Sequence, residues 1–210
     1  MMRIGVVGVQ GAPYDDVLNA VRLGGALAVE LGPHPHDLSG ADALVLTDTV
    51  DTLSEAIVHA AQRGLPVLGI GRGFGALCAA GLLPGSLLGN DRRTFVCREQ
   101  RVRVESRDTV WTCAMDEGQN LDLVLTGGGL GFGVEPDVAA RLETNRQVVL
   151  RYVDVNPDGS VHDIAGITNE SGTVVGVLVR PEYAVEALTG PSEDGLLFLG
   201  SVLSYLRAAA

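Results

Sequence analysis

The stretch LPVLGIGRGFGALCAAGLLPG, residues 65–85, constrains the fold more than any other part of the sequence. A short apolar run ends at Ile70, a tight turn flanked by Gly69 and Gly73 follows, and helical periodicity comes after it. This spacing is typical of a nucleophile elbow, a sharp strand-to-helix turn that presents a nucleophilic side chain at its middle position. The middle position here is Gly71. The sequence therefore predicts the elbow turn that would present a nucleophile, with a glycine in place of the nucleophilic residue.

The first half of the chain alternates strand-like and helix-like segments, which predicts a doubly wound α/β sheet. Two glycines interrupt the first helical segment, so its second part, 26–30, is alternatively a strand. Thr52 and Glu55 have the spacing of a capping box at the start of the second helix. The expected strands are 3–9, 42–46 and 65–70, and the expected helices are 15–31 and 52–63.

The second half has a different pattern, because apolar and charged residues alternate as in half-exposed antiparallel strands. The glycine-rich segment 126–133 lacks the ending of a phosphate-binding loop, and we expect a flexible loop there. We find no linker and expect one domain, 1–210. The expected strands are 95–105, 109–115, 147–155, 164–168 and 174–179, with a turn at 156–160 and a helix at 195–206.

Composition excludes several functions. The 210 residues carry a net charge of −11, which argues against nucleic acid and anionic membranes as partners. No apolar stretch is long enough to span a membrane and no signal peptide is evident, so we expect a cytoplasmic protein. The three cysteines lack metal-ligand spacing, and we expect reduced thiols, no metal and no cofactor.

Four segments resemble the glutaminase subunit of phosphoribosylformylglycinamidine synthase, a class I glutamine amidotransferase of purine biosynthesis. The resemblance implies a flavodoxin-like, three-layer α/β/α fold with a mostly parallel central sheet and an added antiparallel segment. It also implies a synthetase-type large subunit as partner. The segments are PVLGIGRGFGALCAAGLLPGSLLGN (66–90), TFVCREQRVRVE (94–105), YVDVNPDGSVHDIAGITNESGTVVGVLVRPEYA (152–184) and SEDGLLFLGSVLSYL (192–206).

The resemblance also implies a mechanism that this sequence does not complete. The family's nucleophilic cysteine corresponds to Gly71, and its base histidine, in a His-Pro-Glu motif, corresponds to Arg180. Of that motif's acid–base pair only Glu182, the orienting acid, remains. The family's glycine-rich oxyanion segment corresponds to 47–51, and a further family motif, His-Gly-Glu-Gly, corresponds to 127–130. An arginine guanidinium does not accept a proton at neutral pH.

None of the remaining thiols or imidazoles is a strong replacement. We expect Cys78 and Cys97 to be structural, and Cys113 is the least constrained of the three. We expect the imidazoles to lie at the surface or in turns; the histidines are His34, His36, His59 and His162.

Two arginines suggest binding rather than catalysis. Arg72 lies at the start of the helix that follows the elbow, where free N–H groups and the helix dipole favour anions. With Arg180 and Glu182 in the same pocket, the site would suit a carboxylate or phosphate. The alternative is that both arginines are drifted surface residues.

Three functional interpretations follow. The first is a catalytically degenerate subunit, structural or regulatory, that docks to a synthetase and lacks glutaminase activity. The second is a repurposed enzyme or binding protein for a small anionic metabolite, anchored by the residues above with Asp48 or Asp51 as acids. The third is an active amidotransferase with a non-standard nucleophile. The sequence leaves the oligomeric state open.

Overall fold

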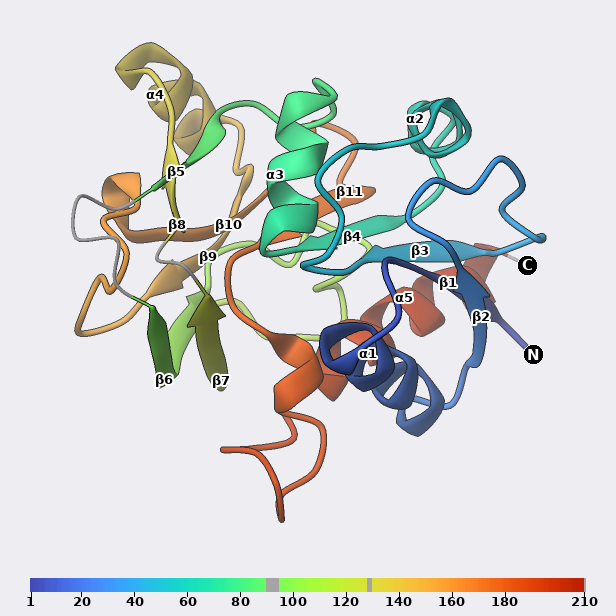
Figure 1. Cartoon of the computed structure of the whole chain (residues 1–210). Helices are drawn as coiled ribbons and strands as arrows, with labels where there is room; N and C mark the ends of the chain where they lie inside the picture. Colours follow the sequence, from blue (N-terminus) through green and yellow to red (C-terminus); the bar gives the residue numbers. More distant parts are fainter. Residues whose placement is uncertain (90–94, 128–129, 210) are drawn as a thin grey trace.

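A computed structural model describes residues 1–89, 95–127 and 130–209. A mixed sheet of nine strands runs through the molecule in the order β2-β1-β3-β4-β11-β10-β9-β6-β7 (Figure 1). The strands are β1 (Arg3–Val7), β2 (Leu27–Leu31), β3 (Ala43–Leu46), β4 (Val67–Ile70), β6 (Val96–Val104), β7 (Asn120–Gly127), β9 (Val148–Tyr152), β10 (Ile164–Thr168) and β11 (Val174–Val177).

The sheet has a parallel part and an antiparallel part. Strands β2, β1, β3, β4 and β11 pair in parallel. Strands β10, β9, β6 and β7 add antiparallel neighbours on one side. A separate two-stranded antiparallel sheet joins β5 (Ser86–Gly89) to β8 (Leu130–Gly133). The predicted fold class, a layered α/β sheet with an antiparallel addition, is confirmed.

Helices cover both faces of the parallel part (Figure 1). In that view α2 and α3 lie above the sheet, and α1 and α5 lie below it. The inner parallel strands are consequently almost continuously apolar and buried, as in β3 and β4, whereas the edge strand β2 is mostly exposed or half-buried. The helices are α1 (Ala12–Leu23), α2 (Glu55–Gln62), α3 (Arg72–Ala79), α4 (Pro136–Thr144) and α5 (Leu196–Ala209), with short 3-10 turns η1 (Val161–Asp163) and η2 (Pro181–Tyr183).

Several local expectations are corrected. The first helix ends at Leu23 and a strand follows, so the alternative interpretation of that segment holds. Helix α2 begins after Ser54 and not after Thr52, so the predicted capping box is wrong. The Ser54 hydroxyl donates instead to the carbonyl of Pro35, 2.7 Å away. Within the described residues, no helix is both long enough and apolar enough to cross a membrane.

Two predictions for the second half are wrong. The segment 109–115 forms turns and not a strand. The hydroxyl oxygens of Thr109 and Thr112 lie 2.8 Å apart in a hydrogen bond, and the Thr112 hydroxyl also donates to the Ser106 carbonyl, which stabilises this compact conformation. The segment 126–133 is not a flexible loop where the structure describes it, since β7 ends at Gly127 and β8 begins at Leu130. Residues 128 and 129 lie outside the described residues.

Candidate functional site

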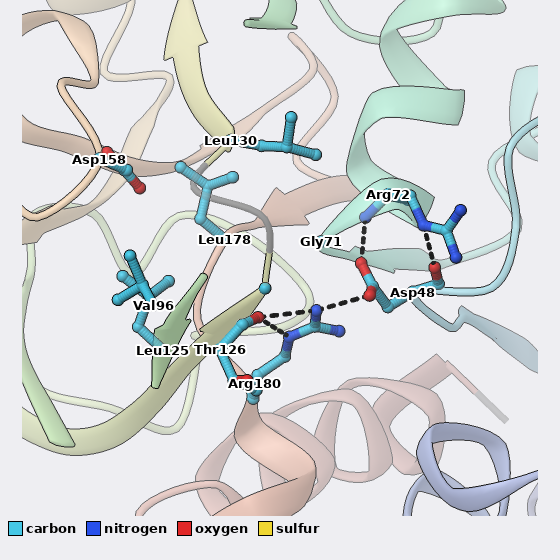
Figure 2. A pocket seen from close by; sticks show the side chains of 11 residues that line it. Asp48, Gly71, Arg72, Val96, Leu125, Thr126, Leu130, Asp158, Leu178 and Arg180 are labelled. Carbon is cyan, nitrogen blue, oxygen red and sulfur yellow. Dashed lines mark hydrogen bonds and ion pairs between the residues drawn. The ribbon is translucent and has the colours of Figure 1, made fainter. Parts of the chain in front are cut away.

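The candidate site lies where four strands of the large sheet meet at one edge (Figure 2). Asp48 follows β3, Gly71 follows β4 and Arg180 follows β11. Because β3, β4 and β11 are parallel neighbours, their carboxyl ends lie together and bring these three residues side by side. Thr126, near the end of β7, completes the edge, because Arg180 forms an antiparallel bridge with Val124.

The strand-to-helix turn has the conformation expected of an elbow. Gly71 has φ 54° and ψ −115°, a region that glycine adopts far more easily than other residues. Its carbonyl accepts the N–H groups of Phe74 and Gly75 and so starts helix α3. A Cβ on Gly73 would lie 2.5 Å from the carbonyl oxygen of Leu46, so the helix can approach β3 this closely only with glycine there. The predicted elbow is present, and its middle position carries no side chain.

Arg180 fills part of the space beside the elbow. Its side chain is 5% exposed, so the expectation of a drifted surface arginine is wrong for this residue. The Nε and Nη2 groups donate to the carbonyl of Thr126 at 3.2 and 2.9 Å. Nη2 also lies 2.7 Å from Oδ2 of Asp48, and Nη1 lies 3.8 Å from Oε1 of Glu182. The guanidinium is therefore held between two carboxyl groups and a carbonyl.

Asp48 fills the rest of that space. Its Oδ1 accepts the backbone N–H of Arg72, the first residue of α3, at 2.7 Å. Its Oδ2 pairs with Arg180, so one carboxylate bridges the helix N-terminus and the guanidinium (Figure 2). A Cβ on Gly71 would lie only 2.2 Å from Oδ1. Glycine at position 71 thus leaves room for the Asp48 carboxylate in this position, whereas a larger residue would require that carboxylate to shift.

The side chain of Arg72 points away from this carboxylate. Its Nε donates to the backbone carbonyl of Asp48 at 2.7 Å, and Nη1 lies 3.1 Å from Oδ1 of Asp51. The side chain is 47% exposed. Both arginines therefore border the same cavity. The backbone N–H of Arg72 binds the Asp48 carboxylate, whereas its guanidinium forms an exposed ion pair with Asp51.

Glu182 lies behind Arg180 and does not line the cavity. It is buried, and its Oε2 accepts no hydrogen bond from the described part of the chain. Burial raises the pKa of this carboxyl to about 7, although the Arg180 guanidinium acts in the opposite direction. Glu182 is thus a buried carboxyl next to the Arg180 guanidinium.

A cavity of about 190 Å³ opens next to these groups. Its polar lining includes Asp48, Arg180 and Asp158. The Asp158 carboxylate accepts the hydroxyl of Tyr152 at 2.6 Å and the hydroxyl of Ser160 at 2.7 Å. The other walls are mostly apolar side chains from strand ends and loops, which sequence reasoning did not single out: Val96, Leu125, Leu130 and Leu178.

All three cysteines and all four histidines belong to the described residues, and none of them lines this cavity. Val96 faces the cavity, so the strand alternation turns Cys97 to the opposite, exposed face. Cys78 is half-buried, its Sγ lies 3.6 Å from the carbonyl of Pro84, and burial raises the pKa of its thiol to about 12. Cys113 is also half-buried, 3.3 Å from the carbonyl of Ser201.

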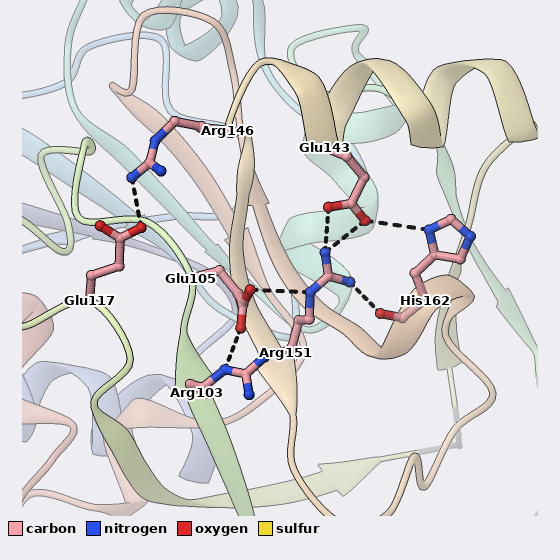
Figure 3. Close-up of polar contacts among 7 residues, drawn as sticks. All are labelled: Arg103, Glu105, Glu117, Glu143, Arg146, Arg151 and His162. Atoms are coloured by element: carbon pink, nitrogen blue, oxygen red, sulfur yellow. Dashed lines mark hydrogen bonds and ion pairs between the residues drawn. The ribbon is translucent and has the colours of Figure 1, made fainter.

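His162 belongs to a surface network (Figure 3). Its Nδ1 lies 3.4 Å from Oε1 of Glu143, and its carbonyl accepts an N–H of Arg151. Arg151 also pairs with Glu143 and with Glu105, which in turn contacts Arg103. The His162 imidazole therefore contacts this surface network and does not line the candidate site.

The mostly parallel sheet with an elbow at the carboxyl end of a central strand is an architecture of the glutamine amidotransferase class, and the family match identifies that class. Residues 27–195 match the family described as the CobB/CobQ-like glutamine amidotransferase domain. The phosphoribosylformylglycinamidine synthase subunit PurQ of Frankia casuarinae is 45% identical over 222 residues, covering 99% of this chain and 95% of the relative. The chain belongs to the PurQ family of glutamine amidotransferase subunits.

Other comparisons agree. The PurQ subunit of Leifsonia xyli is 41% identical, covering 96% of this chain and 97% of the relative. The solved structure of PurLQS from Thermotoga maritima matches with a TM-score of 0.84 and 32% identity, over 98% of this chain and 99% of that chain. The 222-residue alignment with the Frankia casuarinae relative is longer than this 210-residue chain. That relative therefore has residues that this chain lacks.

Proposed function

We propose that this chain is a PurQ-type subunit that does not hydrolyse glutamine and that serves a structural or regulatory role beside a synthetase subunit. One observation carries the proposal. The position that should hold a nucleophile is Gly71, and the Asp48 carboxylate and Arg180 guanidinium take up the space that its side chain would need. The proposed pathway is purine biosynthesis, because the relatives are subunits of phosphoribosylformylglycinamidine synthase.

The chemistry supports this reading. Amide hydrolysis by this class needs a nucleophile, a base beside it and donors for the tetrahedral oxyanion. Gly71 supplies no nucleophile, and Arg180 cannot accept a proton at neutral pH. Asp48 accepts the N–H of Arg72, so a carboxylate already holds a donor at the start of the elbow helix. The three requirements are lost together at one place in the fold.

The proposed partner is a synthetase-type large subunit. The solved structure of PurLQS from Thermotoga maritima matches nearly the whole of this chain. A chain that keeps this fold can keep a docking surface while it loses hydrolysis. The amination reaction of such an assembly would then take its nitrogen from free ammonia.

Reconstitution tests the proposal. The purified chain is mixed with a synthetase subunit from the same genome, and product formation is compared with glutamine and with ammonium as nitrogen donor. The Frankia casuarinae PurQ subunit with its own synthetase is the matched control. We expect a complex in size-exclusion chromatography, product with ammonium and no product with glutamine. Product with glutamine would contradict the proposal, and so would the absence of any complex.

A second candidate is a binding protein for a small anion, anchored by the Arg180 guanidinium and the backbone N–H of Arg72, with Glu182 behind Arg180 and outside the cavity. The cavity of about 190 Å³ beside Arg180 favours it. It requires the Asp48 carboxylate to leave the guanidinium. A thermal-shift panel of anionic metabolites tests it: stabilisation of the wild-type chain that disappears in Arg180→Ala supports it, and no stabilisation by any member of the panel counts against it.

A further inference from the structure

Asp48 makes the contacts that a bound carboxylate ligand would make. One oxygen accepts the N–H of Arg72 at the N-terminus of helix α3, and the other lies 2.7 Å from Nη2 of Arg180. A helix N-terminus and a guanidinium are the two groups that proteins use most readily to hold a carboxylate. In this chain both groups, the N–H of Arg72 and the guanidinium of Arg180, are occupied by the side chain of Asp48.

The groups that hold this carboxylate are fixed in advance. Arg180 is anchored by two hydrogen bonds to the Thr126 carbonyl and is almost fully buried. On the other side, the Thr47 and Thr49 hydroxyls bond to each other at 2.7 Å, and the Thr49 hydroxyl accepts the N–H of Val9. The loop that carries Asp48 is therefore held in place independently of its carboxylate.

The carboxylate also borders open space. The Asp48 side chain is 23% exposed and lines the cavity of about 190 Å³, whose further walls include Leu125, Leu130 and Leu178. A small molecule that placed its own carboxylate between Arg72 and Arg180 would lay its remaining atoms against these aliphatic side chains. The chemistry of the site thus fits a short-chain aliphatic carboxylate.

We propose that this is a carboxylate-binding site which the chain fills with its own Asp48 and thereby closes to external carboxylates. The inference concerns the same site as the proposed function and rests on it in one respect. A Cβ at position 71 would lie 2.2 Å from Oδ1, so Asp48 can hold the position seen here only while residue 71 is the glycine that removes the nucleophile.

Tethering explains why the site is closed. An external carboxylate must compete with one that is always present at the high effective concentration of an intramolecular group. Its apparent dissociation constant rises in inverse proportion to the fraction of molecules in which Asp48 has moved away. Glu182 does not replace Asp48, because it approaches the other terminal nitrogen of Arg180, at 3.8 Å.

The test compares the wild-type chain with Asp48→Ala and with Asp51→Ala. Asp51 is the matched control, because its carboxylate pairs with the exposed guanidinium of Arg72 and not with the anion position. Formate and butyrate are titrated against chloride at constant ionic strength, with melting temperature and calorimetry as readouts. We expect saturable binding to Asp48→Ala with a dissociation constant at least about tenfold below those of wild type and Asp51→Ala. Butyrate should bind more tightly than formate, because its chain reaches the aliphatic walls.

Each outcome decides the inference. Equal formate affinity in wild type and Asp48→Ala, or no saturable binding to the variant, overturns it. Loss of binding in Asp48→Ala/Arg180→Met supports the assigned site. If Asp48→Ala is unfolded in chloride, refolding in formate supports the inference, and failure of formate to refold it or to bind Asp48→Ser overturns it. Glutamate release by the wild-type chain would instead contradict the proposed function and leave these binding results unchanged.

Discussion

The guanidinium of Arg180 and the carboxylate of Asp48 form an ion pair, 2.7 Å between Nη2 and Oδ2, beside Gly71, the middle position of the elbow. The two residues are far apart in the sequence and meet because each follows a strand of the same parallel sheet. The Arg180 side chain is almost fully buried. The pair therefore joins a buried guanidinium to a carboxylate at the wall of the cavity, and loss of either partner leaves the other without its counter-charge.

Replacement of Arg180 by methionine should destabilise the chain by about 3 kcal/mol, because it leaves the buried Glu182 carboxyl and the partly buried Asp48 carboxylate without their cation. Arg101→Met is the matched control. Arg101 pairs with Asp122 at 2.8 Å, but both side chains are about half exposed, so its removal should cost less than about 1 kcal/mol. Urea unfolding measures both values. Equal losses in the two variants would contradict a buried role for Arg180.

Gly71 and Asp48 should be energetically coupled. Gly71→Ala places a Cβ 2.2 Å from Oδ1 of Asp48 at a backbone conformation that alanine rarely adopts, and we expect a loss of at least about 2 kcal/mol. Asp48→Ala removes the collision but not the backbone strain. Gly71→Ala should therefore cost about 1 kcal/mol less in the Asp48→Ala background than in the wild-type chain. Strict additivity in this double-mutant cycle would contradict the contact.

The buried Glu182 carboxyl should make stability depend on pH. Burial raises its pKa in the folded chain to about 7, whereas the unfolded value is about 4.3. The folded chain then binds more protons than the unfolded chain between these values. The stabilisation from this group is fully present below about pH 4 and is lost as the pH rises through 7.

Glu182→Gln should remove this dependence. Between pH 5 and pH 8 the free energy of unfolding of the wild-type chain should fall by about 2 kcal/mol more than that of the variant. Chemical denaturation at a series of pH values measures the difference. Glu186→Gln, which changes an exposed carboxyl, should follow the wild type. Parallel profiles for wild type and Glu182→Gln would show that the carboxyl titrates normally.

The three thiols should differ in reactivity, and none should be labelled by a glutamine analogue. Cys97 is exposed and should react quickly with a thiol reagent, while Cys78 should react only on unfolding because burial raises its pKa to about 12. Mass spectrometry of labelled peptides, with Cys97→Ser as control, assigns each thiol. Labelling of Cys78 or Cys113 by a glutamine analogue in the folded chain would favour a non-standard nucleophile.

Much of the fold follows from local pattern. The apolar run and paired glycines at 65–85 predict the central strand, the elbow and the helix, because only glycine allows the backbone contacts seen at Gly73. The sequence-based expectations do not include helix α4 or strand β7, although both have recognisable sequence patterns. Pro136 begins the helix, and Leu121, Leu123 and Leu125 alternate with less buried residues along the strand. The neighbouring glycines at 127–129 favour a loop prediction for this part of the sequence.

The site could be predicted only in part. Sequence comparison within the family pattern identifies Gly71 and Arg180, since their positions are set by adjacent motifs. It does not predict that Asp48 bridges Arg180 and the N-terminus of α3, because that contact depends on the order of strands in the sheet and on the course of a loop. The general signal was available: a polar residue that directly follows a buried parallel strand lies at the edge where ligands bind.

The measurement that tests the central claim most directly is glutamate release from glutamine by the purified chain together with a synthetase subunit and its substrates, with the Frankia casuarinae PurQ subunit assayed in parallel. The account predicts a rate indistinguishable from the blank for this chain, with Gly71 at the elbow, and turnover for the relative. Glutamate release above the blank that persists through further purification and rises in proportion to the concentration of this chain would contradict it.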